Sequence, residues 1–453
     1  MSTRDDSGTE EKFILSFYGD DFTGSTDVME TLALNGLPAA LFLKTPALDE
    51  VNNFQLKKNI GGDKLRAFGV AGIARSLEPE AMKKELEPVF SGLAKIPSHF
   101  FQYKICSTLD SSPQYGNIGI ATDLALKYFP SPMIPFIVGA PFLNRFVAFS
   151  NLFARLDDET YRLDRHPVMS RHPVTPMQEG DIRLHMARQS ERQFSVYDLI
   201  HLAAGALPKA AGNPDEVKYL LFDTLTNEDL VKIGSLLFKV KGKSPQLLVA
   251  SSGISFGIAR HIQNEEKRKD QPVMKIPPVK QILVAAGSCS PVTARQIEYA
   301  LKSGMRGLRI DVLNLVENQH KEIDRIYQKA LNILNDGNSP VLYTALGPDD
   351  PSINELENKL SKNRNILLGE SIGEIVSQIL AGKDKLRTVI VGGDTSGYVT
   401  RYLQIYALET MAPVAPGAPL CMAHARDARF DGLEIALKGG QNGKDDYFEK
   451  IMG

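Results

Sequence analysis

The feature that most constrains the fold is the pattern at residues 388–401, TVIVGGDTSGYVTR, where a β-branched run stops at two glycines and an amphipathic pattern follows. This order predicts a strand, a glycine turn and a helix. Gly392 and Gly393 can adopt backbone angles closed to other residues, and Thr395 or Ser396 is expected to cap the helix. Such a helix N-terminus can bind a phosphate, although the pattern is neither GxGxxG nor the P-loop GxxxxGK[ST], and glycines in αβ connections often serve the turn alone.

The same order occurs at residues 13–43, FILSFYGDDFTGSTDVMETLALNGLPAALFL, which predicts a strand, a helix capped by Thr23 or Ser25, and a second strand. Asp20 and Asp21 then lie at the carboxyl end of the first strand, the edge at which open parallel sheets bind ligands. These carboxylates can bind hydroxyl groups, accept a hydroxyl proton or help to place Mg²⁺. The alternative is a solvated turn before a helix, where acids are favoured in any case.

Two further segments are rich in polar side chains. The predicted strand HFFQYK is followed by a stretch of hydroxyl, acid and amide groups suited to a polyol or sugar acid, although long turns have the same composition. The candidate binding residues in it are Ser107, Thr108, Asp110, Ser111 and Asn117. A basic cluster follows later in the chain, which can bind a carboxylate or phosphate or can simply be a surface loop. Its members are Arg162, Arg165, His166, Arg171 and His172.

Strand and helix patterns alternate along the 453 residues, which predicts an α/β fold with two doubly wound domains, mainly parallel sheets and an active site in the cleft between the domains. Residues 1–12 are polar and are expected to form a disordered tail. A charge run followed by prolines predicts a linker at residues 264–280. The first domain then covers residues 13–263 and the second covers residues 281–453.

The second domain has three glycine or serine turns at predicted strand ends. Ser288 follows QILVAAG and precedes a helix with Pro291 in its first turn, Gly392 follows TVIV, and Gly440 follows LEIALK. Each turn can face a nucleotide, and the Ser288 hydroxyl can donate to a phosphate.

Composition restricts the partners. A formal charge of −2 gives no basic field for nucleic acid and no polybasic patch for a membrane, so a small-molecule ligand is expected. Residues 1–12 lack the apolar segment of a signal peptide, and the longest uncharged run, residues 128–144, contains four prolines. The three cysteines match no metal-ligand spacing and indicate a reducing cytoplasm.

Six segments resemble, in the same order, motifs of the four-carbon acid sugar kinase family. YGDDFTGSTDVMETL is similar to its ADDLTGA-type opening, YKICSTLDSSPQYGNIG to CSTFDST..GNIG, and RHPVTPM to HPV.PM. GSCSPVTARQI is similar to GS.S..T..Q, VGGDTSG to GGDTAG, and ALKGGQNG to LKSGNFG. The resemblance covers about residues 13–448.

This resemblance implies an N-terminal sugar-acid-binding domain, a C-terminal nucleotide-binding domain, and transfer of the γ-phosphoryl group of ATP, with Mg²⁺, to the terminal hydroxyl of a small sugar acid. It places the substrate near Asp20, Asp21, the loop at residues 107–119, Arg171 and His172. Asp21, and as second choice Asp20, is expected to accept the hydroxyl proton. The metal ligands are not identified. The residues expected to contact ATP are Ser288, Gly392, Gly393, Asp394, Thr395 and Gly440.

The substrate remains open between alternatives. The chain has Ser107-Thr-Leu-Asp-Ser-Ser where kinases of threonate or erythronate tend to have STLRGN, which indicates the branch acting on 3-oxo acids such as 3-oxo-tetronate. The segments YRLDRHPVMSRHP and GAPFLNRF resemble 3-oxo-isoapionate kinases instead. An NAD-linked dehydrogenase is disfavoured because GxGxxG is absent, and a non-catalytic binding protein would not need the second domain. A homodimer is possible, and the oligomeric state is not specified.

Overall fold

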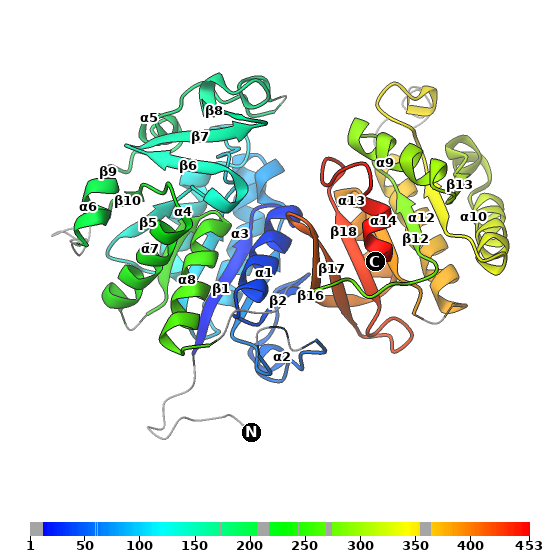
Figure 1. Ribbon diagram of the computed structural model, residues 1–453, viewed down its shortest axis with the longest axis horizontal. Coiled ribbons are helices and arrows are strands. Elements are labelled where there is room, and N and C mark those ends of the chain that lie inside the picture. The colour runs from blue at the N-terminus through cyan, green and yellow to red at the C-terminus, as the bar shows by residue number, and fades with distance from the viewer. Residues whose placement is uncertain are drawn as a thin grey trace. The chain divides into compact units, whose positions relative to one another are not determined.

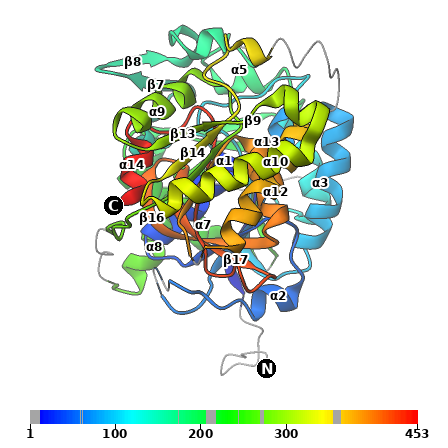
Figure 2. The ribbon, with the colours of Figure 1, turned by 90° about the vertical axis from the view of Figure 1, so that its right-hand side faces the viewer.

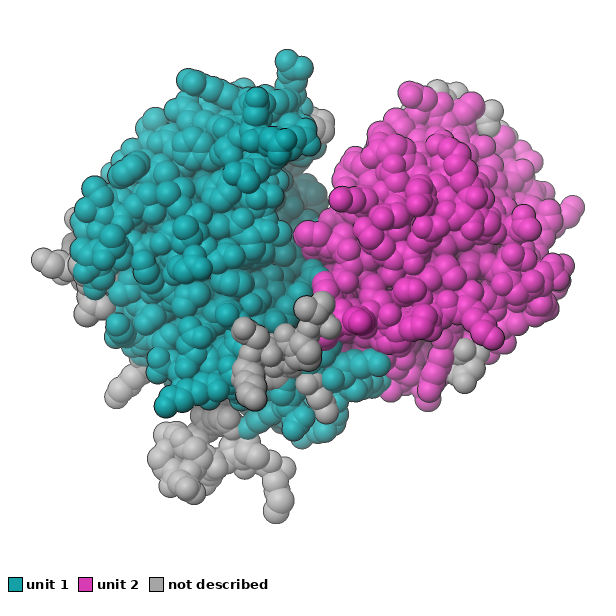
Figure 3. All heavy atoms as spheres, viewed as in Figure 1, with its two compact units in different colours: residues 1–271 teal, residues 272–453 magenta. Residues whose placement is uncertain are grey.

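The computed structural model describes residues 12–58, 60, 62–172, 174–205, 217–242, 244–268, 274–353, 364–383 and 385–453. The chain divides into two compact units, residues 1–271 and 272–453, which are coloured separately in Figure 3. The predicted tail lies outside the described residues except for Lys12, and so do residues 269–273 of the predicted linker. The last helix before that linker extends to Glu265, two residues beyond the predicted domain end.

Unit 1 is built on a parallel sheet with the strand order β2-β3-β1-β4-β11-β5-β10-β9. Strands β1, β2, β5, β9 and β10 of this sheet are labelled in Figure 1. Apart from the partly exposed edge strand β9, these strands are largely buried on both faces, as expected for a doubly wound sheet. Their bounds are β1 (Phe13–Gly19), β2 (Ala39–Phe42), β3 (Ala67–Ala71), β4 (Ser98–Lys104), β5 (Ile134–Ile137), β9 (Phe194–Tyr197), β10 (Tyr219–Phe222) and β11 (Gln246–Ala250).

Helices cover both faces of this sheet. Because β-α-β crossovers are right-handed, the strand order places α1, α7 and α8 on one face and α3 and α4 on the other. The second group packs on an aromatic core in which the Phe101 and Phe129 rings stack 3.9 Å apart. The helices are α1 (Phe22–Leu34), α2 (Leu48–Asn52), α3 (Pro79–Leu93), α4 (Ile118–Tyr128), α5 (Ile182–Met186), α6 (Leu199–Ala204), α7 (Asn227–Val240) and α8 (Ser252–Glu265).

A second, antiparallel sheet in unit 1 was not expected from the sequence. It consists of β6 (Arg145–Ala148), β7 (Asn151–Leu156) and β8 (Glu159–Arg162), in the order β6-β7-β8. The turn between β6 and β7 has positive φ angles at Phe149 and Ser150, and the fully buried Asp223 carboxylate accepts both of their backbone N–H groups. Asp223, which follows β10, therefore stabilises this turn.

Unit 2 has a sheet with the order β13-β14-β12-β15-β18-β17-β16, parallel from β13 to β18 and antiparallel beyond. The Pro-Gly segment after residue 415 is the turn of the β16–β17 hairpin, where Gly417 has a φ of 68°. The strands are β12 (Leu283–Ala286), β13 (Arg306–Arg309), β14 (Pro340–Tyr343), β15 (Thr388–Val391), β16 (Ile405–Ala415), β17 (Ala418–Ala425) and β18 (Glu434–Lys438).

The helices of unit 2 also lie on both sides of its sheet. Helix α9 packs with α14, whereas α12 packs against both α10 and α13, and Figure 2 shows α10 and α12 side by side. Helix α10 is capped by Asp311, whose Oδ1 accepts the N–H groups of Leu313 and Asn314. The bounds are α9 (Pro291–Lys302), α10 (Val312–Asn335), α12 (Arg364–Ala381), α13 (Gly393–Tyr402) and α14 (Tyr447–Met452).

Each sheet has a topological switch point, where successive strands are added on opposite sides. In unit 1 it lies between β1 and β4, and in unit 2 between β12 and β15. Ligands of open α/β sheets bind at the carboxyl ends of the strands at such points. In the described part of the chain, no helix is both long enough and apolar enough to cross a membrane.

Candidate functional site

In unit 1, four charged residues lie at the carboxyl ends of three neighbouring strands. Asp20 and Asp21 follow β1, Arg75 follows β3 in a short 3₁₀ helix (Ala74–Ser76), and Lys104 closes β4. The strands are adjacent, since Gly19 pairs with both Ala71 and Lys104. We call Asp20, Asp21, Arg75 and Lys104 the acidic edge.

Arg75 joins the two aspartates of the acidic edge. Its Nε donates to Asp20 Oδ2 at 3.1 Å, and its Nη2 donates to Asp20 Oδ1 at 2.7 Å and lies 2.8 Å from Asp21 Oδ1. Asp20 is 4% exposed, and this burial raises the pKa of its carboxyl group, although the positive charge of Arg75 opposes that rise. Asp20 is thus fixed by a bidentate ion pair, a structural role that was not predicted from the sequence.

Asp21 is the N-cap of helix α1, because its Oδ1 accepts the N–H of Gly24 at 2.8 Å. The prediction that Thr23 or Ser25 caps this helix is wrong. The Ser25 hydroxyl donates to the Asp21 carbonyl instead, at 2.6 Å. An aspartate in this position satisfies an N–H group and also interacts favourably with the helix dipole.

The hydroxyl-rich loop connects β4 to α4 in the same unit. Thr108 donates to Asp110 at 2.8 Å, and Asn117 caps α4 by accepting the N–H of Ile120 at 2.9 Å. The buried Ser111 hydroxyl lies 2.9 Å from Gln189 Nε2 and 3.2 Å from His185 Nε2. Ser111 and Asn117 therefore hold the loop in place. Substrate binding by Ser107, Thr108, Asp110, Ser111 and Asn117 stays a prediction.

Three members of the basic cluster make contacts with residues that are close to them in the sequence. Arg162 pairs with Asp164, and the imidazoles of His166 and His172 accept backbone N–H groups of the turns that follow them. Arg171 is exposed. Among the residues that the structure describes, no hydrogen bond or ion pair connects Arg171 or His172 to the acidic edge, so their role in substrate binding also stays a prediction.

In unit 2, the three predicted turns meet at the ends of three adjacent strands. The N–H of Gly287 donates to Val391 at 3.0 Å, and the N–H of Gly392 donates to Lys438 at 2.9 Å. We call the turns at residues 287–290, 392–395 and 439–440 the glycine cluster. The close approach of its members requires glycine, because a Cβ on Gly440 would lie 2.2 Å from Ser288 Oγ and a Cβ on Gly287 would lie 2.1 Å from Thr395 Oγ1.

Helix α13 starts within the glycine cluster and has no side-chain cap. Its N-cap is Gly392, with a φ of 119°, so the prediction that Thr395 or Ser396 caps the helix is wrong. Thr395 is buried against Gly287, and the Ser396 hydroxyl donates back to the Gly392 carbonyl at 2.8 Å. Gly393 and Asp394 are exposed, and a Cβ on Gly393 would meet no atom within 4 Å. Within the described ranges, no side chain accepts a hydrogen bond from the N–H groups of this first turn.

Residues 288–293 and 440 are joined by hydrogen bonds. Ser290 caps α9 by accepting the N–H of Thr293 at 3.1 Å, and the hydroxyls of both residues donate to the Gly440 carbonyl, at 2.5 and 2.9 Å. Ser288 Oγ accepts the N–H of Ser290 at 3.2 Å, which leaves its own hydroxyl hydrogen available to a ligand. Pro291 occupies the first turn of α9, as predicted.

Sequence reasoning missed three cations at strand ends: Arg75, Lys104 and Lys438. Lys438 closes β18, is 1% exposed, and donates from Nζ to the Gly439 carbonyl at 3.1 Å. Burial lowers its pKa to about 7. For Lys104 and Lys438, the sequence contained a usable signal, a lysine at the end of an otherwise largely apolar or aromatic strand, as in HFFQYK and LEIALK.

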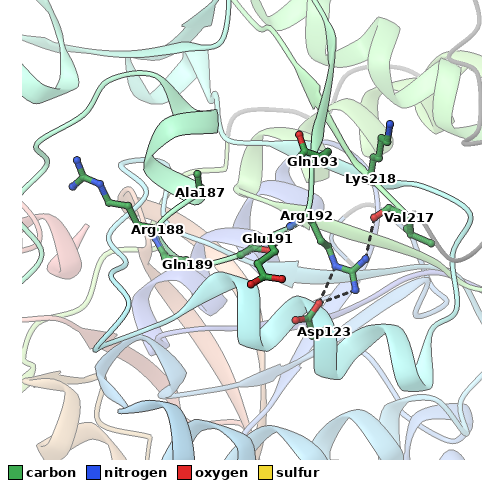
Figure 4. Close-up of a pocket in the computed structure, with 10 residues that line it drawn as sticks. Asp123, Ala187, Arg188, Gln189, Glu191, Arg192, Gln193, Val217 and Lys218 are labelled. Atoms are coloured by element: carbon green, nitrogen blue, oxygen red, sulfur yellow. Dashed lines mark hydrogen bonds and ion pairs between the residues drawn. The ribbon is translucent and has the colours of Figure 1, made fainter.

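A cavity of about 870 Å³ lies elsewhere in unit 1, lined by residues 187–193, Asp123, Val217 and Lys218 (Figure 4). Arg192 in its lining donates to Asp123 at 2.8 Å and to the Val217 carbonyl at 2.9 Å. None of the residues predicted to bind substrate or nucleotide lines this cavity.

Comparison with known proteins matches both units. Residues 15–258 match the sugar-binding N-terminal domain family, and residues 283–448 match the nucleotide-binding C-terminal domain family. A 3-oxo-isoapionate kinase of Paraburkholderia graminis is 38% identical over 97% of this chain and 94% of its own length. A 3-oxo-tetronate kinase of Cupriavidus necator is 29% identical over 97% and 96%.

Two solved structures share the fold. A Haemophilus influenzae protein superposes with a TM-score of 0.70 at 22% identity, covering 97% of this chain and 99% of its own. A Salmonella typhimurium protein described as a putative tRNA synthase gives 0.73 at 21% identity, covering 97% and 98%. Fold and matches together define a protein with a sugar-binding unit and a nucleotide-binding unit. The chain belongs to the four-carbon acid sugar kinase family, a group of ATP-dependent sugar-acid kinases.

Proposed function

We propose that this enzyme transfers the γ-phosphoryl group of ATP to the terminal hydroxyl of a 3-oxo sugar acid, with 3-oxo-isoapionate as the first candidate. The observation that carries this choice is the 38% identity to a 3-oxo-isoapionate kinase, against 29% to a 3-oxo-tetronate kinase, over the same 97% of the chain. The second candidate is 3-oxo-tetronate, because the CSTLDSS segment indicates the branch acting on 3-oxo acids in general and the 29% identical relative is a 3-oxo-tetronate kinase.

The nucleotide phosphates bind at the glycine cluster in this proposal. The uncapped N-terminus of α13 offers backbone N–H groups and the positive end of a helix dipole, both of which favour an anion. Gly393 leaves open space beside them, and the Ser288 hydroxyl can donate from the adjacent turn. Gly392, Asp394, Thr395 and Gly440 complete the predicted contact set.

The sugar acid binds at the acidic edge, where Asp21 accepts the proton. Arg75 and the Gly24 N–H both contact Asp21 Oδ1, and these two contacts orient the carboxylate. As the hydroxyl oxygen bonds to the γ-phosphorus, the bond to the bridging oxygen breaks, ADP leaves, and the hydroxyl proton passes to Asp21. Asp20 is the second choice because both of its oxygens are engaged by Arg75.

Mg²⁺ fits this proposal as an ion bound mainly to the nucleotide. The described residues include no group of three or more His, Cys, Asp or Glu side chains able to hold a metal. Mg²⁺ usually takes only one or two carboxylates together with phosphate oxygens and water, and the exposed Asp394 in the first turn of α13 could supply one. When bound, the ion would neutralise phosphate charge.

A coupled assay of ADP release tests this proposal with 3-oxo-isoapionate, 3-oxo-tetronate, threonate and erythronate. We expect ATP-dependent turnover, with the highest kcat/KM for 3-oxo-isoapionate. A higher value for 3-oxo-tetronate would reverse the order of the two candidates. Oxidation of a sugar acid with NAD and no ADP release would contradict the kinase. Phosphoryl transfer also requires the bound sugar acid and the bound ATP to meet, which is why the active site is expected between the two domains. This location stays a prediction.

A further inference from the structure

Lys104 has an unusual environment for a lysine. It is the last residue of β4, pairs with Gly19 on one side and Ala250 on the other, and is 3% exposed. Its ammonium group lies against the first turn of α1, because a Cβ on Gly24 would stand 2.6 Å from Lys104 Nζ. The buried hydrocarbon chain thus carries the charge to the carboxyl edge of the sheet, beside the switch point.

The other cation at this edge is already paired. Arg75 makes two contacts with Asp20 and a third with Asp21. In contrast, Lys104 Nζ has neither a hydrogen bond nor a carboxylate oxygen within 4.0 Å among the described residues. Among the described residues, Lys104 Nζ is not one of the unpaired side-chain atoms that are completely shielded from solvent. A largely buried ammonium group with three unused donors is costly unless a ligand supplies the acceptors.

We infer, on the basis of the proposed function, that the Lys104 ammonium group binds the carboxylate of the sugar-acid substrate. Lys104 Nζ and Asp21 Oδ1 lie 2.6 and 2.4 Å from the same point, the position of a Cβ on Gly24, so a small acid can contact both residues. Glycine at position 24 permits this close approach of Lys104 and Asp21, because a Cβ there would clash with both side chains.

The surrounding charges favour a carboxylate over a phosphate as this ligand. Asp20, Asp21 and Asp27 all act on the same region as Lys104, and the Lys104 charge opposes the rise in the pKa of Asp27 that burial causes. A singly charged carboxylate balances one ammonium group. A phosphate with two charges would be repelled by the aspartates that Arg75 does not fully neutralise.

The test compares the sugar acid with its uncharged primary amide, using calorimetric binding to the whole enzyme. In the wild type, the acid should bind at least tenfold more tightly than the amide. In Lys104→Met, the affinity for the acid should fall by about 10- to 100-fold, and the affinity for the amide should change little. Lys83→Met is the matched control, because Lys83 is an exposed lysine on α3 that pairs with Glu80.

Equal binding of acid and amide to the wild type would overturn this inference, and that measurement requires no variant to fold. Retention of the preference for the acid in a folded Lys104→Met or Lys104→Gln protein would also overturn it. ADP release by the wild type separates this result from the proposed function. Turnover of the acid together with a negative binding result refutes the role of Lys104 alone, whereas absence of turnover with every acid refutes the kinase proposal itself.

Discussion

The burial of Lys438 predicts a specific dependence of stability on pH. Its ammonium group contacts only the Gly439 carbonyl and the ring of Tyr447, whose centroid is 5.5 Å away, and it has no carboxylate within 4.0 Å among the described residues. Burial lowers its pKa from 10.5 to about 7. Between these values, the unfolded chain binds one more proton at this site than the folded chain does, so stability rises with pH.

The magnitude follows from the two pKa values. A pKa difference of one between the folded and unfolded chain corresponds to about 1.4 kcal/mol, so the destabilisation caused by this lysine should decrease by about 2 kcal/mol between pH 7 and pH 9. In Lys438→Met, this contribution is absent at every pH. The difference in free energy of unfolding, wild type minus variant, should therefore become about 2 kcal/mol more favourable to the wild type over that interval.

Urea unfolding followed by circular dichroism at pH 7 and pH 9 measures this difference. The transition of unit 2 is the one that ATP shifts to higher urea, because a ligand stabilises the unit that binds it. Lys302→Met, at the exposed end of α9, is the control and should show no such change with pH. A difference between wild type and Lys438→Met that is the same at both pH values would show that burial does not lower the pKa of Lys438.

Three other substitutions test the two candidate sites. Gly393→Val should weaken ATP binding at least tenfold without loss of stability, because the valine side chain enters open space beside the α13 N-terminus. Unchanged affinity in a nucleotide titration would mean that the turn binds no phosphate. Asp21→Asn should retain the α1 cap, lower kcat by at least about a hundredfold and have little effect on ATP affinity. A change confined to the KM for the sugar acid would refute the role of Asp21 as base. Asp20→Asn should destabilise unit 1 by about 3 kcal/mol in urea unfolding, because it leaves Arg75 with one carboxylate. If Asp20→Asn lowered the stability of unit 1 no more than Asp21→Asn does, the structural role of Asp20 would be contradicted.

Local sequence signals predicted much of the fold. Helix α3 begins with proline at its first position and has an apolar stripe that ends at Leu93, two signals that the sequence contains. The strand ends at Gly19, Ala286 and Val391 were also correct, since buried runs stop at polar or glycine turns. The β16–β17 hairpin was missed because its strands are buried along most of their length and lack the alternation of a half-exposed hairpin.

The candidate site was predictable where its residues are close in sequence. Asp20 and Asp21 follow a strand directly, and the three turns of the glycine cluster each contain their own signal. The partner of Asp20 was not predictable, because Arg75 is 55 positions away and the ion pair depends on the pairing of β1 with β3. The capping assignments failed for a related reason. Asp21 and Gly392 directly precede their helices, and the expected hydroxyl residues lie inside them.

The most direct test of the proposed reaction is to identify the product by ³¹P NMR after incubation of the enzyme with ATP, Mg²⁺ and 3-oxo-isoapionate. We expect one new phosphomonoester signal, split into a triplet by the two protons of a terminal CH₂ group, in amounts equal to the ADP formed. Asp21→Asn should give the same signal much more slowly. A doublet from a secondary alcohol would contradict transfer to the terminal hydroxyl. Release of inorganic phosphate without a phosphomonoester would contradict the assignment of the chain's activity as a sugar-acid kinase.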